Sequence, residues 1–250
     1  MPVRSDPHPV VERFARVRAA AAARYGPDSQ AVTFLLYEEL ISMRTLLAGD
    51  PGCAPARDRI DELVPDIQSR YDTAGAVEPA QVYHRTVSVD PTVIEFDRGF
   101  FELRYRRALR DLGRRAVRIR DRDQALALLT AGACYLYAVD DEGDLWVWPQ
   151  PHRLADVMFG WAPGRPAEGP RVVHPMLVPD RLRVRAAGEL VVVGSPERVF
   201  VTANLKSGHF RPPRACAAEI RRAATSALEL TSPVDVDVFT MPQPTVTPTC

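Results

Sequence analysis

Residues 171–213, RVVHPMLVPDRLRVRAAGELVVVGSPERVFVTANLKSGHFRPP, decide the fold that we expect for this 250-residue chain. Across 181–186, arginines alternate with apolar residues, which is typical of a β-strand with one solvent-facing side. Two apolar runs, 191–193 and 199–201, flank the turn residues 194–197, Gly-Ser-Pro-Glu. This spacing predicts a β-hairpin with a four-residue turn.

Helical periodicity dominates the chain before this segment. The predicted helices cover residues 10–25, 28–48, 56–71, 99–113 and 124–131, with a break or kink at Pro65 in the third. A strand or extended connector is expected at 83–89, a hairpin at 134–147, a long Pro- and Gly-containing loop at 149–170, a helix at 214–230 and a strand at 234–239.

The order of these elements predicts an α+β protein, with a helical N-terminal half packed on an antiparallel β-sheet and closed by a C-terminal helix and strand. We expect a helical region over 1–132, an α+β domain over 133–241 and a flexible tail over 242–250. At this length, one compact domain is the alternative.

The composition excludes several function classes. Acidic and basic residues both number 32, so no global field draws the chain to nucleic acid or to a membrane. Four widely spaced cysteines and the lack of a signal peptide or long apolar run predict a cytoplasmic, non-membrane protein, and the many arginines are typical of a high-GC bacterial genome. No P-loop, dinucleotide fingerprint or zinc-protease motif occurs, so no cofactor and no metal are expected.

The segment 206–213, KSGHFRPP, follows the second hairpin strand and is the candidate site. His209 is the expected principal acid/base, because imidazole titrates near neutrality. We expect four neighbouring side chains to hold an anionic substrate: Asn204, Lys206, Ser207 and Arg211. Gly208 is expected to permit a positive φ or a close approach, and Pro212 to hold the residue before it extended.

Glu189 and His174 are the expected assistants of His209. Glu189 lies among apolar strand residues, so it is expected to point into a pocket with a raised pKa. Three alternatives remain open at this stage: Glu189 pairs with an arginine at 181, 183 or 185, His174 only ends a strand, and His209 only braces its loop. No residue is well placed to be a nucleophile, so a covalent mechanism is the minority view.

The pattern formed by His174, the Ala-Ala-Gly-Glu-Leu of 186–190, the short hairpin and the Ser-Gly-His-Phe-Arg-Pro of 207–212 resembles the C-terminal domain of plant IQ-motif (IQM) calmodulin-binding proteins. Related uncharacterised fungal and bacterial proteins, some of them toxin-like, look similar. The resemblance covers about residues 134–241 and implies a fold and a site more than a reaction. The IQ motif itself is absent, so calmodulin is not an expected partner, and Pro175 and Met176 replace the family's small residues.

An arginine-rich stretch, residues 104–122, contains nine arginines and Tyr105. It is either a face that tracks the phosphates of RNA or a nucleotide, or a solvated helix face whose charge is diluted by aspartates. Residues 140–144, Asp-Asp-Glu-Gly-Asp, lack the spacing of a calcium loop and are expected to form a charged hairpin turn.

These features together predict a small cytosolic transferase or hydrolase. Its chemistry is expected to be metal-independent acid/base catalysis on a phosphate-rich substrate, either a nucleotide or RNA, aminoacyl-tRNA included. The alternatives are a non-catalytic binding or scaffold module and an RNase-like toxin domain. The sequence leaves the oligomeric state open.

Overall fold

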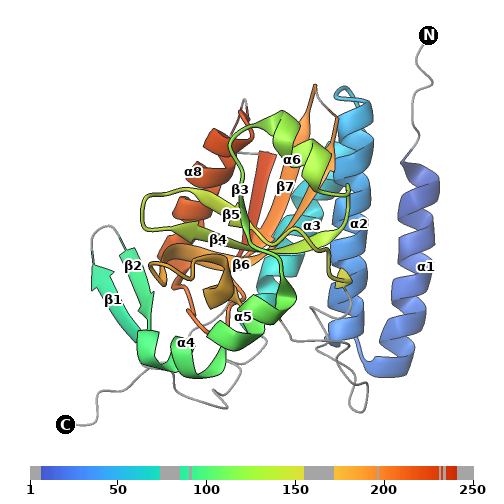
Figure 1. Ribbon diagram of the computed structural model, residues 1–250. Coiled ribbons are helices and arrows are strands. Elements are labelled where there is room, and N and C mark those ends of the chain that lie inside the picture. The colour runs from blue at the N-terminus through green and yellow to red at the C-terminus, as the bar shows by residue number, and fades with distance from the viewer. Residues whose placement is uncertain are drawn as a thin grey trace.

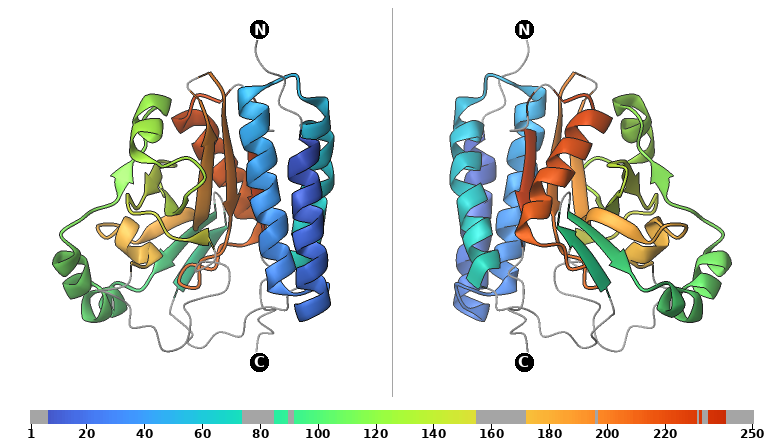
Figure 2. Two further views of the ribbon diagram at one scale, coloured as in Figure 1. Left: turned by 90° about the vertical axis from the view of Figure 1, so that its right-hand side faces the viewer. Right: turned by 90° about the vertical axis from the view of Figure 1, so that its left-hand side faces the viewer.

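The computed structural model describes residues 7–73, 85–89, 92–154, 172–195, 197–230, 232 and 235–240. The tail at 242–250 and most of the loop expected at 149–170 lie outside these residues. In the described part, a β-sheet lies between two layers of helices (Figures 1 and 2). None of the described helices is long and apolar enough to span a membrane.

Three long helices cover one face of the sheet: α1 (His8–Tyr25), α2 (Gln30–Gly49) and α3 (Ala54–Thr73). Buried apolar residues recur along α2 and α3 at helical spacing and pack against the sheet. Of the break or kink expected at Pro65, the break does not occur, because α3 continues through this residue. A proline removes a single N–H from the helical ladder, and buried Ile60, Leu63 and Ile67 hold both sides of it in the core.

The remaining helices are shorter. The helix expected at 99–113 is divided at Tyr105 into α4 (Arg98–Arg104) and α5 (Arg106–Leu112). The other helical segments are α6 (Arg122–Leu128), the 3₁₀ turns η1 (His174–Leu177) and η2 (Arg214–Cys216), and α8 (Ala217–Ala227), which covers the second face of the sheet.

The described sheet contains eight strands in the order β1-β2-β6-β4-β5-β3, with β7 paired to β6 and β8 paired to β7. Their bounds are β1 (Arg85–Val89), β2 (Thr92–Phe96), β3 (Val117–Arg118), β4 (Cys134–Asp140), β5 (Leu145–Val147), β6 (Arg183–Gly194), β7 (Val199–Asn204) and β8 (Val236–Phe239). The α+β class is confirmed, and so are both hairpins. The sheet also includes β1, β2 and β3, which precede the segment expected to form it.

The sheet is mixed rather than wholly antiparallel, since β8 runs parallel to β7. A parallel pair needs a crossover connection, and α8 provides it by carrying the chain back across the sheet. A closing helix and strand were expected, but the strand was expected to be antiparallel, whereas β8 runs parallel to β7.

The long strand β6 organises the sheet. One of its edges pairs with β4 over most of its length. On the opposite edge, β2 pairs only at Arg183 and Val184, whereas β7 pairs from Leu190 to Gly194. The middle of this edge therefore has no strand neighbour among the described residues. The chain leaving β7 crosses to β2 there, since Phe210 packs edge-on against Phe96 with ring centroids 5.9 Å apart.

A buried ion pair fastens the helical layer to the last strand. Arg44 of α2 donates to both carboxylate oxygens of Asp237 of β8, at 2.9 and 2.7 Å. Its guanidinium also lies 4.9 Å from the ring centroid of Phe200. Burial raises the pKa of Asp237, and Arg44 counteracts this shift.

We expect Arg44→Met to lower the free energy of unfolding by about 3–5 kcal/mol, because it leaves the Asp237 carboxylate buried without its cation. Urea denaturation followed by circular dichroism measures the change. Arg107→Met is the control, because that side chain is 90% exposed, and a change below about 0.5 kcal/mol is expected there. Equal midpoints for the two variants would contradict the role of the pair.

Candidate functional site

The candidate site is built around the close approach of Gly188 of β6 to Asn204 of β7. A Cβ atom at position 188 would lie 2.0 Å from the carbonyl oxygen of Asn204 and 2.9 Å from its carbonyl carbon. Backbone cannot move aside as the end of a flexible side chain can, so only glycine fits here.

Asn204 continues the hydrogen bonding of β6 beyond the end of β7. Its Oδ1 accepts from the backbone N–H of Glu189 at 3.1 Å and from that of Lys206 at 2.9 Å. The Tyr137 hydroxyl donates to the Asn204 carbonyl at 2.9 Å. Asn204, expected to bind substrate, is 5% exposed and fixes the backbone of the two residues that flank the site.

Glu189 lies on the face of the sheet that α2 and α3 cover, the same face as Val191, two residues further along β6. Its side chain is buried, and Oε2 has no hydrogen-bond partner among the described residues. Burial raises the pKa of Glu189 to about 7, although Lys206 and the Asn204 side chain act in the opposite direction. The raised pKa agrees with the expectation from sequence.

The three arginines considered as partners of Glu189 bind elsewhere. Arg181 and Arg183 pair with Asp141, and Arg185 donates to the Asp141 carbonyl oxygen. Arg181 also pairs with Glu142, and Arg185 with Glu219.

The charge of Glu189 acts on three buried hydroxyl and thiol groups. They belong to Tyr37 of α2, Tyr71 of α3 and Cys134 of β4. Burial raises the pKa of each of these groups, and the charge of Glu189 raises it further. These groups therefore stay protonated near neutral pH. Cys134 is a free thiol, and its raised pKa makes it a poor nucleophile.

His174 is held by the backbone of β6. Its Nε2 lies 3.0 Å from the carbonyl oxygen of Gly188, and because a carbonyl only accepts, this nitrogen carries the proton. Burial lowers the pKa of His174 to about 3, and the charges of His209 and His152 act in the same direction. His174 therefore stays neutral and suits a positioning role.

His209 stands in an aromatic setting beside the α4–α5 junction. Its Nε2 lies 3.1 Å from the Tyr105 hydroxyl, and its ring packs edge-on against Tyr105 and Phe96. Burial lowers the pKa of His209 to about 4. The division of the helix at Tyr105 places that hydroxyl against the imidazole.

The loop after β7 owes its shape to residues other than those expected. Ser207 is buried, and its Oγ accepts from the Phe210 N–H at 3.3 Å, so this hydroxyl braces the loop. Gly208 has open space around its Cβ position and no positive φ. Arg211 instead has a φ of 49°, which overturns the extended geometry expected before Pro212. The backbone strain of this loop is therefore at Arg211, which was expected to bind substrate.

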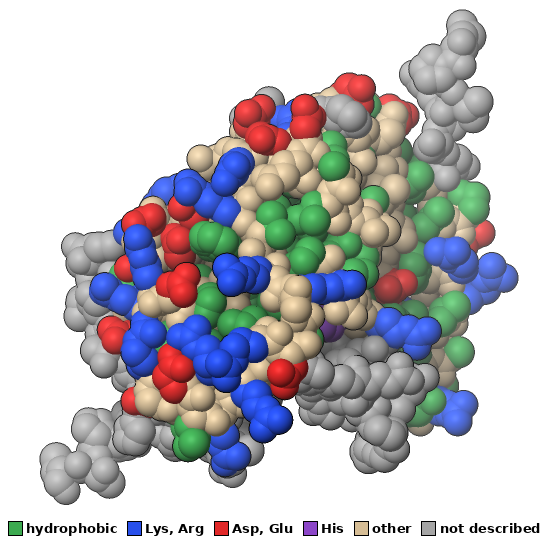
Figure 3. Space-filling view, viewed as in Figure 1, with side chains coloured by type: hydrophobic (Ala, Val, Ile, Leu, Met, Phe, Trp, Pro, Cys, Tyr) green, Lys and Arg blue, Asp and Glu red, His purple; other side chains and the backbone are tan. Residues whose placement is uncertain are grey.

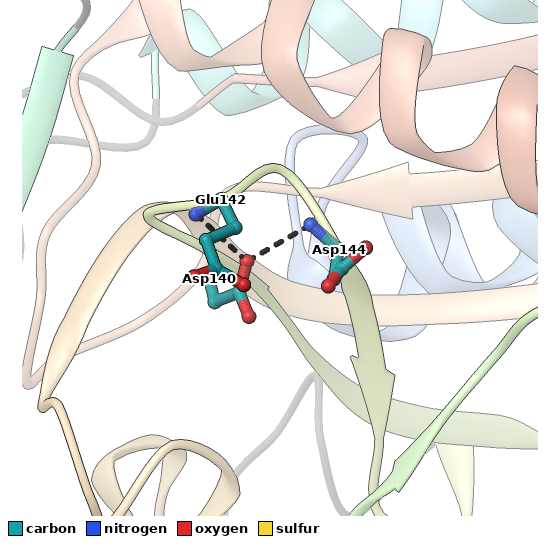
Figure 4. Close-up of side chains that lie close together, drawn as sticks. All are labelled: Asp140, Glu142 and Asp144. Carbon is teal, nitrogen blue, oxygen red and sulfur yellow. Dashed lines mark hydrogen bonds between the residues drawn. The ribbon is translucent and has the colours of Figure 1, made fainter.

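The turn between β4 and β5 matches the expected charged hairpin turn. Oδ1 of Asp140 accepts from the N–H groups of Glu142 at 3.0 Å and Asp144 at 2.9 Å (Figure 4). Oδ2 accepts from the Trp146 indole at 2.8 Å. The three carboxyl groups lie close together, but Asp140 is used by the turn, and Asp144 pairs with Arg118.

The structure thus gathers the expected site residues in two linked groups. Glu189 interacts with Asn204 and Lys206, whereas His174 interacts with Gly188 and His209. Sequence reasoning missed three contributors that no motif marks, Tyr37, Tyr71 and His152, and it noted Tyr105 only as part of the arginine-rich stretch. Comparison with models of protein families, with curated proteins and with solved structures finds no match to this chain.

Gly188→Ala is expected to prevent folding or to lower the free energy of unfolding by more than about 3 kcal/mol, because the methyl group would overlap the Asn204 backbone. Gly208→Ala is the matched control and is expected to change it by less than about 0.5 kcal/mol, since its Cβ meets open space. Thermal unfolding of both variants measures the difference. Wild-type stability in Gly188→Ala would contradict the assigned contact.

Proposed function

We propose that this chain is an enzyme, a transferase or hydrolase, in which Glu189 gives and takes the proton. The observation that carries the proposal is the buried carboxyl, whose pKa is about 7 and whose Oε2 accepts no hydrogen bond from the residues that the structure describes. Such a carboxyl is half protonated at neutral pH, where a general acid/base works best. A group shifted by burial and placed beside a specific charge is a feature of functional sites.

The two histidines take secondary roles in this proposal. With a pKa of about 4, His209 is neutral at pH 7 and a weak base, so its Tyr105 hydrogen bond makes it an orienting group rather than the principal acid/base. His174 holds the β6 backbone at Gly188 beside Glu189. An RNase-like mechanism would require a histidine that titrates near neutrality, which disfavours the toxin alternative.

Lys206 supports an anionic, phosphate-bearing substrate. It is half-buried, and its charge lowers the pKa of Glu189. A positive charge beside the acid/base favours a substrate that carries an anionic group there. A nucleotide or RNA substrate remains our proposal for this reason.

A non-catalytic binding module is the second candidate. The packing of His209 against two aromatic rings and the use of Ser207 inside the loop favour it, since both side chains stabilise the loop itself. In that case Glu189 would be a pH-dependent structural group without a reaction.

Glu189→Gln tests the buried carboxyl through stability. Because the folded pKa of about 7 lies above the ordinary 4.5, the wild-type protein is favoured at low pH and loses that stability as pH rises from 4.5 through 7. Relative to wild type, the variant should therefore gain about 2–3 kcal/mol between pH 4.5 and pH 8. Denaturant unfolding at both values measures this. A pH-independent difference would refute the shifted pKa.

Activity is tested with p-nitrophenyl phosphate, bis(p-nitrophenyl) phosphate and p-nitrophenyl acetate. We expect a rate that changes with an inflection near pH 7, and a loss of about 10²–10⁴-fold in Glu189→Gln. Glu95→Gln is the control, since Glu95 is an exposed carboxyl on β2. Full activity in Glu189→Gln would rule out its role, and no turnover by folded wild type would favour the binding module.

A further inference from the structure

A cavity lies apart from the Glu189 site, between α5, the segment leading into β3, the β4–β5 turn and the segment from Met176 to Arg181. Its volume is about 630 Å³, within the range of clefts that bind small molecules. None of the residues expected from sequence to form the site lines it.

Part of the cavity lining is apolar. Leu109, Met176, Leu177 and Val178 contribute to its lining, and the last three are buried. Trp146 is half-buried and forms part of the wall. The hydrogen bond from its indole N–H to Asp140 fixes the ring. A fixed, partly exposed indole offers a flat surface on which an aromatic ring can stack.

The rim of the cavity carries arginines, and three of them are already paired: Arg106 with Glu102, Arg118 with Asp144, and Arg181 with Glu142. Asp144 and Glu142, which also line the cavity, are neutralised by these pairs with Arg118 and Arg181.

Three other arginines gather where α5 ends at Gly113. Arg110, Arg114 and Arg115 are exposed, line the cavity and form no ion pair with any residue that the structure describes. Figure 3 shows Lys and Arg side chains crowded over this part of the molecule, at the lower left of the view, where Figure 1 places α4 and α5. An arginine fork suits phosphate oxygens in particular.

We propose that this cavity binds a nucleoside diphosphate. The base stacks on Trp146 over the apolar lining, and the two phosphates meet Arg110, Arg114 and Arg115. The inference rests on the cavity's own lining and not on the proposed reaction at Glu189.

The two sites share structural elements. The turn η1 carries His174 on the acid/base side and Met176 on the cavity side. Tyr105, which contacts His209, directly precedes the cavity residue Arg106. The cavity and the His209 environment are therefore joined through the α4–α5 junction and η1.

Calorimetric titration with ADP tests the proposal. We expect ADP to bind wild type more tightly than either adenosine or inorganic phosphate, because each probe supplies half of the contacts. Arg114→Ala/Arg115→Ala should weaken ADP binding about tenfold or more. Trp146→Leu should weaken it about fivefold or more through the lost stacking.

Two controls locate the ligand. Arg107→Ala alters an exposed α5 arginine outside the cavity and should leave the affinity unchanged. Glu189→Gln should also bind ADP as wild type does, so loss of catalysis and loss of this site are distinguishable. No ADP binding at millimolar concentration, equal binding of phosphate alone, tighter binding of single-stranded RNA than of ADP, or loss of binding in Glu189→Gln would each overturn the proposal.

Discussion

The fit of Gly188 against the Asn204 backbone is the contact on which the site depends. It lets β7 end against β6 at a separation that no side chain at position 188 would allow. At that separation, the Asn204 amide oxygen reaches two backbone N–H groups and replaces the strand that is missing beyond it. Glu189, which carries the buried carboxyl, directly follows Gly188 in β6, and the strained loop directly follows Asn204 at the end of β7.

The fold followed from local signals. Alternating residues and turn chemistry predicted the hairpins 134–147 and β6–β7, and helical periodicity predicted α1, α2 and α3 nearly to their ends. The errors arose where tertiary contacts outweigh local preference. Burial of one face carried α3 through Pro65, and the crossover by α8 set the direction of β8. Local sequence contains neither piece of information.

The site was predictable in place but not in role. Motif residues 174, 189, 204 and 209 do lie on adjoining elements, yet their ionisation depends on what buries them. Burial lowers the pKa of His209 away from neutrality and raises that of Glu189 toward it, which reverses the ordinary order of their pKa values. The buried hydroxyls come from α2 and α3, more than a hundred residues away in the chain. Only the folded structure brings these groups together.

The pairing of Arg44 with Asp237 bears on the order in which the chain matures. The helices that form the first layer leave the ribosome early, whereas the carboxylate that neutralises Arg44 follows 193 residues later. Until Asp237 is present, the Arg44 guanidinium has to stay hydrated, so the apolar residues around it cannot be fully buried. The N-terminal helices therefore keep part of their apolar face exposed until Asp237 has been synthesised.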